Sequence, residues 1–282
     1  MTRDSQQTGR RRPDRGQASG QAARREPPRA LLPAPASLLL LGLLGLLGLL
    51  LGWPGSGYGQ EQPDDQPVGL ELLLAVDGSA SIDSPGLAFQ ILGHAAAFQA
   101  LADTRPELLA GPGGGGMAVA LAVWSGPGNF VLWQPWRMIR SGADASAFAV
   151  ALAERATAAE TLPADSTAIG AALDQGMLAL QDNGYIGERQ VIDLVSNGFS
   201  NAGIAPEEAR LRAELLGITI NALVIPDEFP WLERYFMDSV IAGPDAFVVS
   251  VESGADFVGS LLRKLVREMA QAIPVPPPSP AT

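Results

Sequence analysis

The side chains with the clearest chemical potential follow the first apolar run of the predicted folded region. The pattern D-G-S-A-S after residues 70–76 places Asp77, Ser79 and Ser81 at alternate positions, so one carboxylate and two hydroxyls occur close together. Gly78 allows a tight turn, in which all three oxygen-bearing side chains can point toward one centre. Hard oxygen ligands without imidazole or thiolate suit Mg²⁺, with Mn²⁺ or Ca²⁺ as substitutes. The pattern therefore predicts a divalent-cation site.

The composition of the 282-residue chain removes most other kinds of reactive site. The sequence has no cysteine and a single histidine, His94. Disulfide scaffolds, thiolate zinc sites, cysteine nucleophiles and multi-histidine metal sites are therefore excluded. His94 lies on or beside the apolar face of an expected helix. We interpret it as a packed, hydrogen-bonded core histidine, with a catalytic role as the alternative.

Charge is distributed unevenly along the chain. Eight of its 19 basic residues but only three of its 30 acidic residues lie within residues 1–29, which leaves 11 basic and 27 acidic residues and a net charge of −16 beyond them. Nucleic-acid binding depends on neutralising phosphates with Lys and Arg. A body this acidic excludes nucleic acid as the expected partner.

Residues 1–59 have the layout of a secretory signal peptide with a long, disordered basic front end. The Leu/Gly run 38–51 has 14 residues, fewer than the roughly 20 that a helix needs to span a bilayer, and small residues follow it. We therefore expect export, either to a periplasm or to the exterior of the cell. An uncleaved signal is the alternative, and it would be the only attachment to a membrane.

The rest of the chain divides into three expected parts. Residues 60–67 read as an acidic linker, and residues 272–282 as a proline-rich tail. Residues 68–271 between them have a comfortable length for one domain.

Within that domain, short apolar runs alternate with helical patterns. Continuous apolar runs are typical of strands buried on both faces, as in parallel sheets covered by helices. Ser84 is the expected N-cap of the first helix, and Pro206 and Gly217 bracket a later one, with Leu211 and Leu215 on one apolar side. The order predicts an α/β fold with a Rossmann-like, doubly wound, mostly parallel central sheet flanked by helices. The expected strands are 70–76, 117–124, 191–195, 218–225 and 246–251, and the expected helices lie within 84–102, 167–180, 206–217 and 255–269.

In such a sheet, ligands bind where the strands end, and the residues found there resemble the metal-ion-dependent adhesion site of the von Willebrand factor A domain. Asp77, Ser79 and Ser81 match its first motif, D-x-S-x-S. The resemblance extends from about residue 68 to residue 269 and implies the A-domain fold. More narrowly, the chain is similar to a branch of secreted bacterial A-domain proteins of unknown function, through three stretches: 124–128, 191–193 and 240–248.

Two further elements of the resemblance supply the remaining expected site residues. The family pattern T-x-T-G-x-A-L is similar to T-A-I-G-A-A-L, where Thr167 takes the ligand position and Ile169 replaces the second threonine. Asn197 stands where the family has an aspartate after the fourth strand. Because an asparagine carbonyl accepts a hydrogen bond from a metal-bound water but adds no charge, we expect weaker metal binding and stronger attraction for an incoming carboxylate. Asp165 is a candidate accessory that restores part of that charge.

The resemblance implies a binding protein and not an enzyme. In the family, the two serines and the threonine bind the cation directly and leave one coordination position for a partner's Asp or Glu. We therefore expect divalent-cation-dependent binding or adhesion to an unidentified protein ligand. One alternative is a metal-independent structural or assembly module with a degenerate site, which Asn197 and Ile169 favour. The other is a metal-assisted hydrolase with Asp77 or Asp165 as its general base.

Two further groups have structural interpretations. Asp193 lies inside an expected buried strand, where an unpaired carboxylate is costly; we interpret it as a structural hydrogen-bond acceptor, with a metal role as the alternative. Phe229, Trp231, Tyr235 and Phe236 are expected to pack within a helix. The alternative is that these aromatic side chains form an exposed rim near the strand ends.

Overall fold

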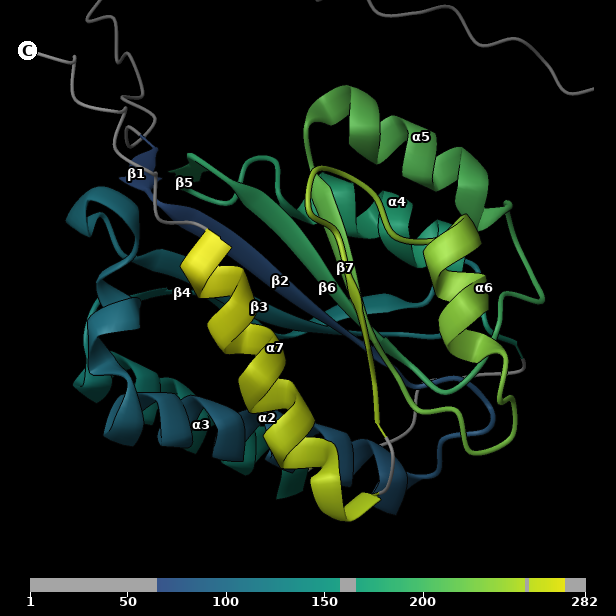
Figure 1. Ribbon diagram of the computed structural model, residues 1–282, viewed down its shortest axis with the longest axis horizontal. Helices are drawn as coiled ribbons and strands as arrows, with labels where there is room; N and C mark the ends of the chain where they lie inside the picture. Colours follow the sequence, from purple (N-terminus) through teal and green to yellow (C-terminus); the bar gives the residue numbers. More distant parts are fainter. Residues whose placement is uncertain (1–64, 158–165, 252–253, 272–282) are drawn as a thin grey trace, which may run out of the picture. The chain divides into compact units, whose positions relative to one another are not determined.

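A six-stranded sheet forms the centre of the computed structural model, which describes residues 65–157, 166–251 and 254–271 (Figure 1). The strand order is β4-β3-β2-β6-β7-β8, and every neighbouring pair is parallel except β3 and β4. The predicted α/β fold with a mostly parallel central sheet is thereby confirmed. The strands are β2 (Leu70–Asp77), β3 (Met117–Trp124), β4 (Phe130–Ile139), β6 (Gln190–Ser196), β7 (Thr219–Val224) and β8 (Val248–Ser250).

Helices cover both faces of this sheet, as Figure 1 shows. On one face α2 contacts α3 and α7, and on the other α5 contacts α4 and α6. Because both faces are covered, every residue of β2 and β3 is buried. Each face of the sheet has its own hydrophobic core, and successive side chains of β2 point alternately into the two cores. Leu72 and Leu74 pack on the α2 side, and Leu73 and Ala75 pack on the α4 side. The helices are α2 (Ser84–Thr104), α3 (Gly142–Thr157), α4 (Ile169–Ala179), α5 (Pro206–Leu216), α6 (Leu232–Ser239) and α7 (Phe257–Gln271).

Smaller elements complete the described structure. A two-stranded parallel sheet pairs β1 (Gln66–Val68) with β5 (Tyr185–Gly187), so Gln66 and Pro67 of the expected linker belong to a strand. The expected signal peptide, residues 60–64 and the expected tail lie outside the described residues. None of the described helices is both long enough and apolar enough to span a bilayer. Three short 3₁₀-helices are η2 (Pro106–Ala110), η3 (Pro112–Gly114) and η4 (Gly254–Asp256).

Two details of the helix predictions are wrong. The N-cap of α2 is Asp83, whose side chain accepts a hydrogen bond from the Gly86 N–H at 2.8 Å, and Ser84 is the first helical residue. On α5, Leu211 and Leu215 are 59% and 87% exposed. Helix α5 packs closely against α4 and therefore buries small side chains instead. Its buried residues are Pro206, Ala209 and Ala213.

Three elements of the central sheet and its helical layers were not anticipated, and neither were the two strands of the small sheet, β1 and β5. Strand β4 is an edge strand of mixed exposure with Pro135 inside it, so it shows neither the continuous apolar run nor the regular alternation that marks the other strands. Helix α3 is rich in alanine, and α6 is only eight residues long. Strand β8 is also shorter than the predicted run 246–251.

His94 is a core histidine, as predicted. Its side chain has no exposed surface, and its Nδ1 atom lies 2.8 Å from the carbonyl oxygen of Gln90, one turn earlier in α2. Burial lowers the pKa of His94 to about 4, and the hydrogen bond with the Gln90 carbonyl oxygen opposes this shift only in part. The imidazole is therefore neutral in the folded protein at neutral pH.

This lowered pKa leads to a pH-dependent prediction. Between pH 6.5 and about 4, His94 is protonated in the unfolded chain but remains neutral in the folded chain. The contribution of this histidine to the free energy of unfolding is therefore fully present above pH 6.5 and decreases as the pH falls. We expect the free energy of unfolding of the native chain, relative to His94→Gln, to decrease by about 3 kcal/mol from pH 7 to pH 4. Urea titrations of both proteins across this range measure the difference, and a difference independent of pH would contradict the prediction.

Candidate metal centre

Asp77, the last residue of β2, anchors the loop that follows. One oxygen of its buried carboxylate accepts a hydrogen bond from the Ser79 N–H at 2.8 Å, and the other accepts one from the Ser196 hydroxyl at 2.5 Å. Burial raises the pKa of the Asp77 carboxyl above its ordinary value, and the hydrogen bonds from Ser196 and Ser79 oppose that rise. The loop after β2 is thereby held against the end of β6.

The hydroxyls of this loop meet the end of β6 directly. Ser79 Oγ lies 3.5 Å from Ser81 Oγ, and the Ser81 hydroxyl donates a hydrogen bond to Asn197 Oδ1 at 3.0 Å. Since β2 and β6 are adjacent parallel strands, their carboxyl ends share one edge of the sheet. The fold therefore brings together Ser81 and Asn197, which are 116 residues apart in the chain.

Thr167 reaches the same edge from the loop before α4. Its backbone N–H donates to Asn201 Oδ1 at 2.8 Å, and the Asn201 N–H donates to the Thr167 carbonyl oxygen at 2.9 Å. This reciprocal pair leaves the Thr167 side chain to line a pocket with Ser81 and Asn197. Asp165, the expected accessory, lies outside the described residues.

Gly170 permits the close packing that places the Thr167 loop. A Cβ atom at this position would lie 2.5 Å from the carbonyl oxygen of Ile204, well inside van der Waals contact. Because Ile204 follows the Asn201 loop directly in the chain, only a glycine lets the start of α4 approach this backbone. The glycine of the second sequence pattern thus has a structural role at the site.

A pocket of about 220 Å³ opens at this edge of the sheet. Ser81, Thr167 and Asn197 line one part of it, whereas Asp77 and Ser79 lie behind them, buried. Two aromatic rings and a carboxylate also line the pocket: Phe199, Phe229 and Glu228.

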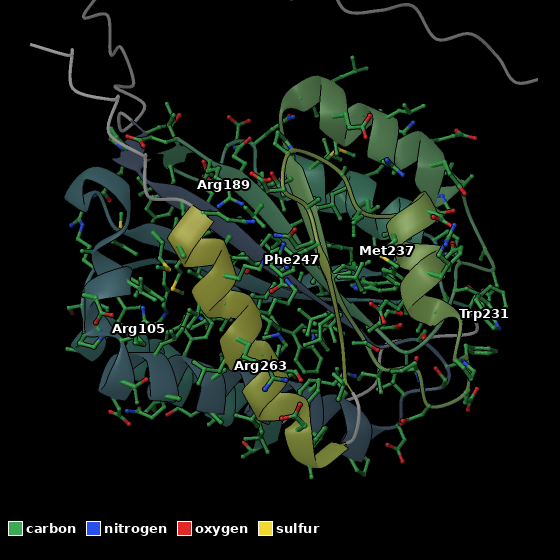
Figure 2. All side chains as sticks on the ribbon, in the orientation of Figure 1. Arg105, Arg189, Trp231, Met237, Phe247 and Arg263 are labelled. Atoms are coloured by element: carbon green, nitrogen blue, oxygen red, sulfur yellow. The ribbon has the colours of Figure 1, made fainter. Side chains whose placement is uncertain are left out.

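The aromatic group divides between the two interpretations that the sequence allowed. Phe236 is fully buried, as predicted for helix packing. Trp231 directly precedes α6 and is 49% exposed, and Figure 2 marks it beside this helix. Its ring centroid lies 5.4 Å from those of both Phe199 and Phe229, which line the pocket. An aromatic rim therefore does adjoin the site.

The residues present fit a hard divalent cation. Mg²⁺ binds six oxygens at 2.0–2.1 Å in an octahedron, so neighbouring ligand oxygens lie about 3 Å apart. Of the proposed direct ligands, Ser79 Oγ and Ser81 Oγ lie 3.5 Å apart, within about half an ångström of this spacing. Among the described residues, no group of three or more His, Cys, Asp or Glu side chains could hold a metal ion. Hydroxyl and amide oxygens therefore make up most of the available ligand atoms, beside the single carboxylate of Glu228 on the pocket wall.

Two polar residues that support the site were missed by sequence reasoning. Ser196 bonds to Asp77, and Asn201 bonds to the Thr167 backbone. The polar run from Ser196 to Asn201 after a buried strand was an available signal. Which of its members face the site depends on the loop conformation.

A mostly parallel sheet with helices on both faces, and a hydroxyl-lined pocket at the carboxyl ends of its strands, is the arrangement of the von Willebrand factor A fold. The chain belongs to the family described as "Protein of unknown function (DUF1194)", which matches residues 67–273. No curated protein has a significantly similar sequence.

Solved structures share this fold. The proximal thread matrix protein 1 of the mussel byssus, in a structure with a zinc-occupied MIDAS motif, is 19% identical with a TM-score of 0.52. The match covers 73% of this chain but 49% of the mussel protein, so the chain spans about half of that protein's length. The vWF domain of the type V pili tip protein Mfa5 from Porphyromonas gingivalis is 10% identical with a TM-score of 0.50, and the match covers 76% of this chain and 98% of that domain. At these identities the likeness establishes the fold alone.

Proposed function

We propose that this chain is an exported von Willebrand factor A domain that binds a protein partner through a divalent cation, most favourably Mg²⁺. The observation that carries the proposal is the convergence of Ser81, Thr167 and Asn197 from three separate loops on one pocket. The zinc-occupied motif of the structurally similar mussel protein adds support for a metal at this place in the fold. Export to the periplasm or beyond is supported by the pattern of residues 1–59.

In this proposal the serines 79 and 81 and Thr167 hold the cation, and Asn197 orients a water bound to it. The cation supplies positive charge for an Asp or Glu carboxylate of the partner. Phe199 and Phe229 provide an apolar wall beside that carboxylate. Asp77 keeps the loop in place and remains out of the pocket.

The same geometry supports a non-enzymatic role. A general base must lie within hydrogen-bonding reach of a substrate proton. Asp77 has no exposed surface, and both of its carboxylate oxygens already accept hydrogen bonds from protein groups. A hydrolase that used Asp77 as its base would have to break these bonds first.

Calorimetric titration with Mg²⁺ tests the cation site. Thr167→Val replaces the hydroxyl by a methyl group of similar shape and leaves the backbone hydrogen bonds to Asn201 intact. We therefore expect the Mg²⁺ affinity to fall by about tenfold or more, and each factor of ten corresponds to about 1.4 kcal/mol of binding free energy. Thr104→Val makes the same chemical change at the far end of α2 and is expected to bind as the native chain does. No Mg²⁺ binding by the native chain, or equal binding by both variants, would refute the cation site.

A second candidate function is a structural or assembly module that does not use metal. The uncharged Asn197 and the apolar Ile169 favour it, since both depart from the family's motif. Capture of envelope proteins on the immobilised chain, with and without EDTA, separates the two candidates. Partners lost in EDTA support cation-dependent binding, whereas partners retained unchanged support the assembly module.

A further inference from the structure

A buried ion cluster joins α7 to the centre of the sheet. Lys264, the single lysine of the chain, contacts Asp193 Oδ1 on β6 through its Nζ atom. The same Nζ lies 2.6 Å from Glu268 Oε1, one turn further along α7. None of the three side chains has any exposed surface. An amine and two carboxyl groups are therefore in direct contact without access to bulk water.

The surroundings hold these groups in a fixed arrangement. Asn221 Nδ2 on β7 donates to Glu268 Oε1 at 3.0 Å. Both carboxylate oxygens of Asp193 and the Oε2 atom of Glu268 are buried and have no hydrogen-bond partner among the described residues. The Phe247 ring, marked beside α7 in Figure 2, has its centroid 5.4 Å from Lys264 Nζ. Phe247 itself is tied to the cluster, because its N–H donates to Asn221 Oδ1 at 3.0 Å.

The charges of this cluster do not balance if every group is ionised. One ammonium facing two carboxylates leaves a net negative charge in a site without solvent, which is strongly unfavourable. Transfer of protons between the groups relieves part of the cost. Covalent condensation of the amine with one carboxyl removes a positive and a negative charge together.

We propose that Lys264 and Asp193 are joined by an intramolecular isopeptide bond, and that Glu268 is the catalytic residue that transfers the protons during its formation. The inference is independent of the cation site, because none of these residues belongs to it.

The reaction needs no reagent from outside the chain. The ammonium of Lys264 gives one proton to Asp193, which leaves a neutral amine and a carboxylic acid. The amine nitrogen attacks Asp193 Cγ, Glu268 takes a proton from this nitrogen, and it returns that proton to the departing hydroxyl. One C–N bond forms, one C–O bond breaks, and one water molecule leaves. No oxidation or reduction occurs.

The protonation states that this reaction requires agree with the environment. Burial raises the pKa of Asp193 above its ordinary value, against the opposing effect of Lys264. Burial and, after it, the negative charge of Asp193 together raise the pKa of Glu268 to about 7. Burial therefore favours the protonated form of both carboxyl groups, and Glu268 exchanges its proton near neutral pH.

An isopeptide bond would constrain the fold much as a disulfide does. Asp193 and Lys264 are 71 residues apart, and the bond would tie the last helix to a central strand. Closing a loop of this length in the unfolded chain raises Tm by an amount on the order of 10 °C. The chain has no cysteine, so no disulfide can supply this constraint.

Peptide mapping of the full chain, unfolded and digested with trypsin, tests the proposal. We expect a branched peptide that joins residues 190–210 to residues 264–267, with a mass lower than the sum of the two by one water molecule. Because Lys264 is the single lysine, an amine-reactive label added in denaturant should modify the N-terminus only. Separate linear peptides, with cleavage after Lys264 and a second label on it, would overturn the proposal.

Two variants test the role of Glu268. Glu268→Gln keeps the shape of the side chain but cannot take up the proton, so we expect the cross-linked fraction to fall by at least about tenfold and Tm to fall on the order of 10 °C. Glu154→Gln makes the same change on the exposed surface of α3 and should remain fully cross-linked. An unchanged cross-linked fraction in Glu268→Gln would overturn the assigned role. If this variant fails to fold, the digest of the native chain still decides whether the bond exists.

Discussion

Replacing Asn197 with aspartate is expected to raise the Mg²⁺ affinity of the candidate metal centre by about tenfold or more. The Asn197 side-chain oxygen already accepts a hydrogen bond from Ser81 Oγ at 3.0 Å, so the substitution adds a negative charge beside the cation site without moving this oxygen. Coulomb attraction for a doubly charged cation then increases in a partly enclosed pocket. Calorimetry with Mg²⁺ on the native chain and on Asn197→Asp measures the gain.

The control for this experiment is Asn201→Asp. Asn201 lines the same pocket, but its Oδ1 accepts a hydrogen bond from the backbone N–H of Thr167. A negative charge added at this position would therefore be stabilised by that N–H and would act less strongly on the cation. We expect a smaller increase in affinity than at position 197. The two variants separate a ligand position from a general effect of charge, and an Asn197→Asp chain that bound Mg²⁺ no better than the native one would contradict the assignment.

A second readout of Asn197→Asp concerns the partner. The uncharged asparagine leaves more of the cation's positive charge available to an incoming carboxylate, and the aspartate takes some of it away. We therefore expect captured partners to be released at lower salt from Asn197→Asp than from the native chain. The native asparagine, in this view, favours binding of the partner over binding of the metal.

Replacing Trp124 with alanine is expected to lower the free energy of unfolding by about 3–5 kcal/mol. Trp124 ends β3, has no exposed surface, and its indole N–H donates to the Ala75 carbonyl oxygen at 3.1 Å. Its removal leaves a large cavity between the sheet and α4 and deprives a buried carbonyl of this hydrogen bond. Urea denaturation followed by circular dichroism measures the loss.

Trp231→Ala is the matched control. This tryptophan is half exposed and packs on the aromatic rim of the pocket and not on the sheet. We expect it to cost no more than about 1 kcal/mol of stability while weakening partner binding, since its ring lies beside the pocket. Equal destabilisation by the two substitutions would contradict the burial argument.

Burial and spacing explain why much of the fold could be predicted. The strands of the central sheet read as continuous apolar runs because helices cover both of its faces. The apolar positions Leu261 and Leu265 of α7 follow the helical repeat because only one side of that helix meets the sheet. The edge strand β4 has no such signature, since it is partly exposed and contains Pro135.

The candidate site was predictable in part for a related reason. Asp77, Ser79 and Ser81 lie within one turn, so their convergence is a local property of the chain. Thr167 and Asn197 were assigned through a family resemblance, because residues so far apart carry no local sign that they meet. Ser196 and Asn201 went unrecognised because their roles rest on hydrogen bonds between loops.

The amino-acid sequence by itself determined the alternation of strands and helices, the hydroxyl-rich turn after β2, and the absence of cysteine and of all lysines but one. These are properties of composition and short-range spacing, so they can be read from the chain without any information on long-range contacts. Only the tertiary structure decided that Asn197 meets Ser81 and that Lys264 lies between two buried carboxyl groups. Such meetings depend on strand order and helix packing, which bring together groups that the chain separates by tens of residues.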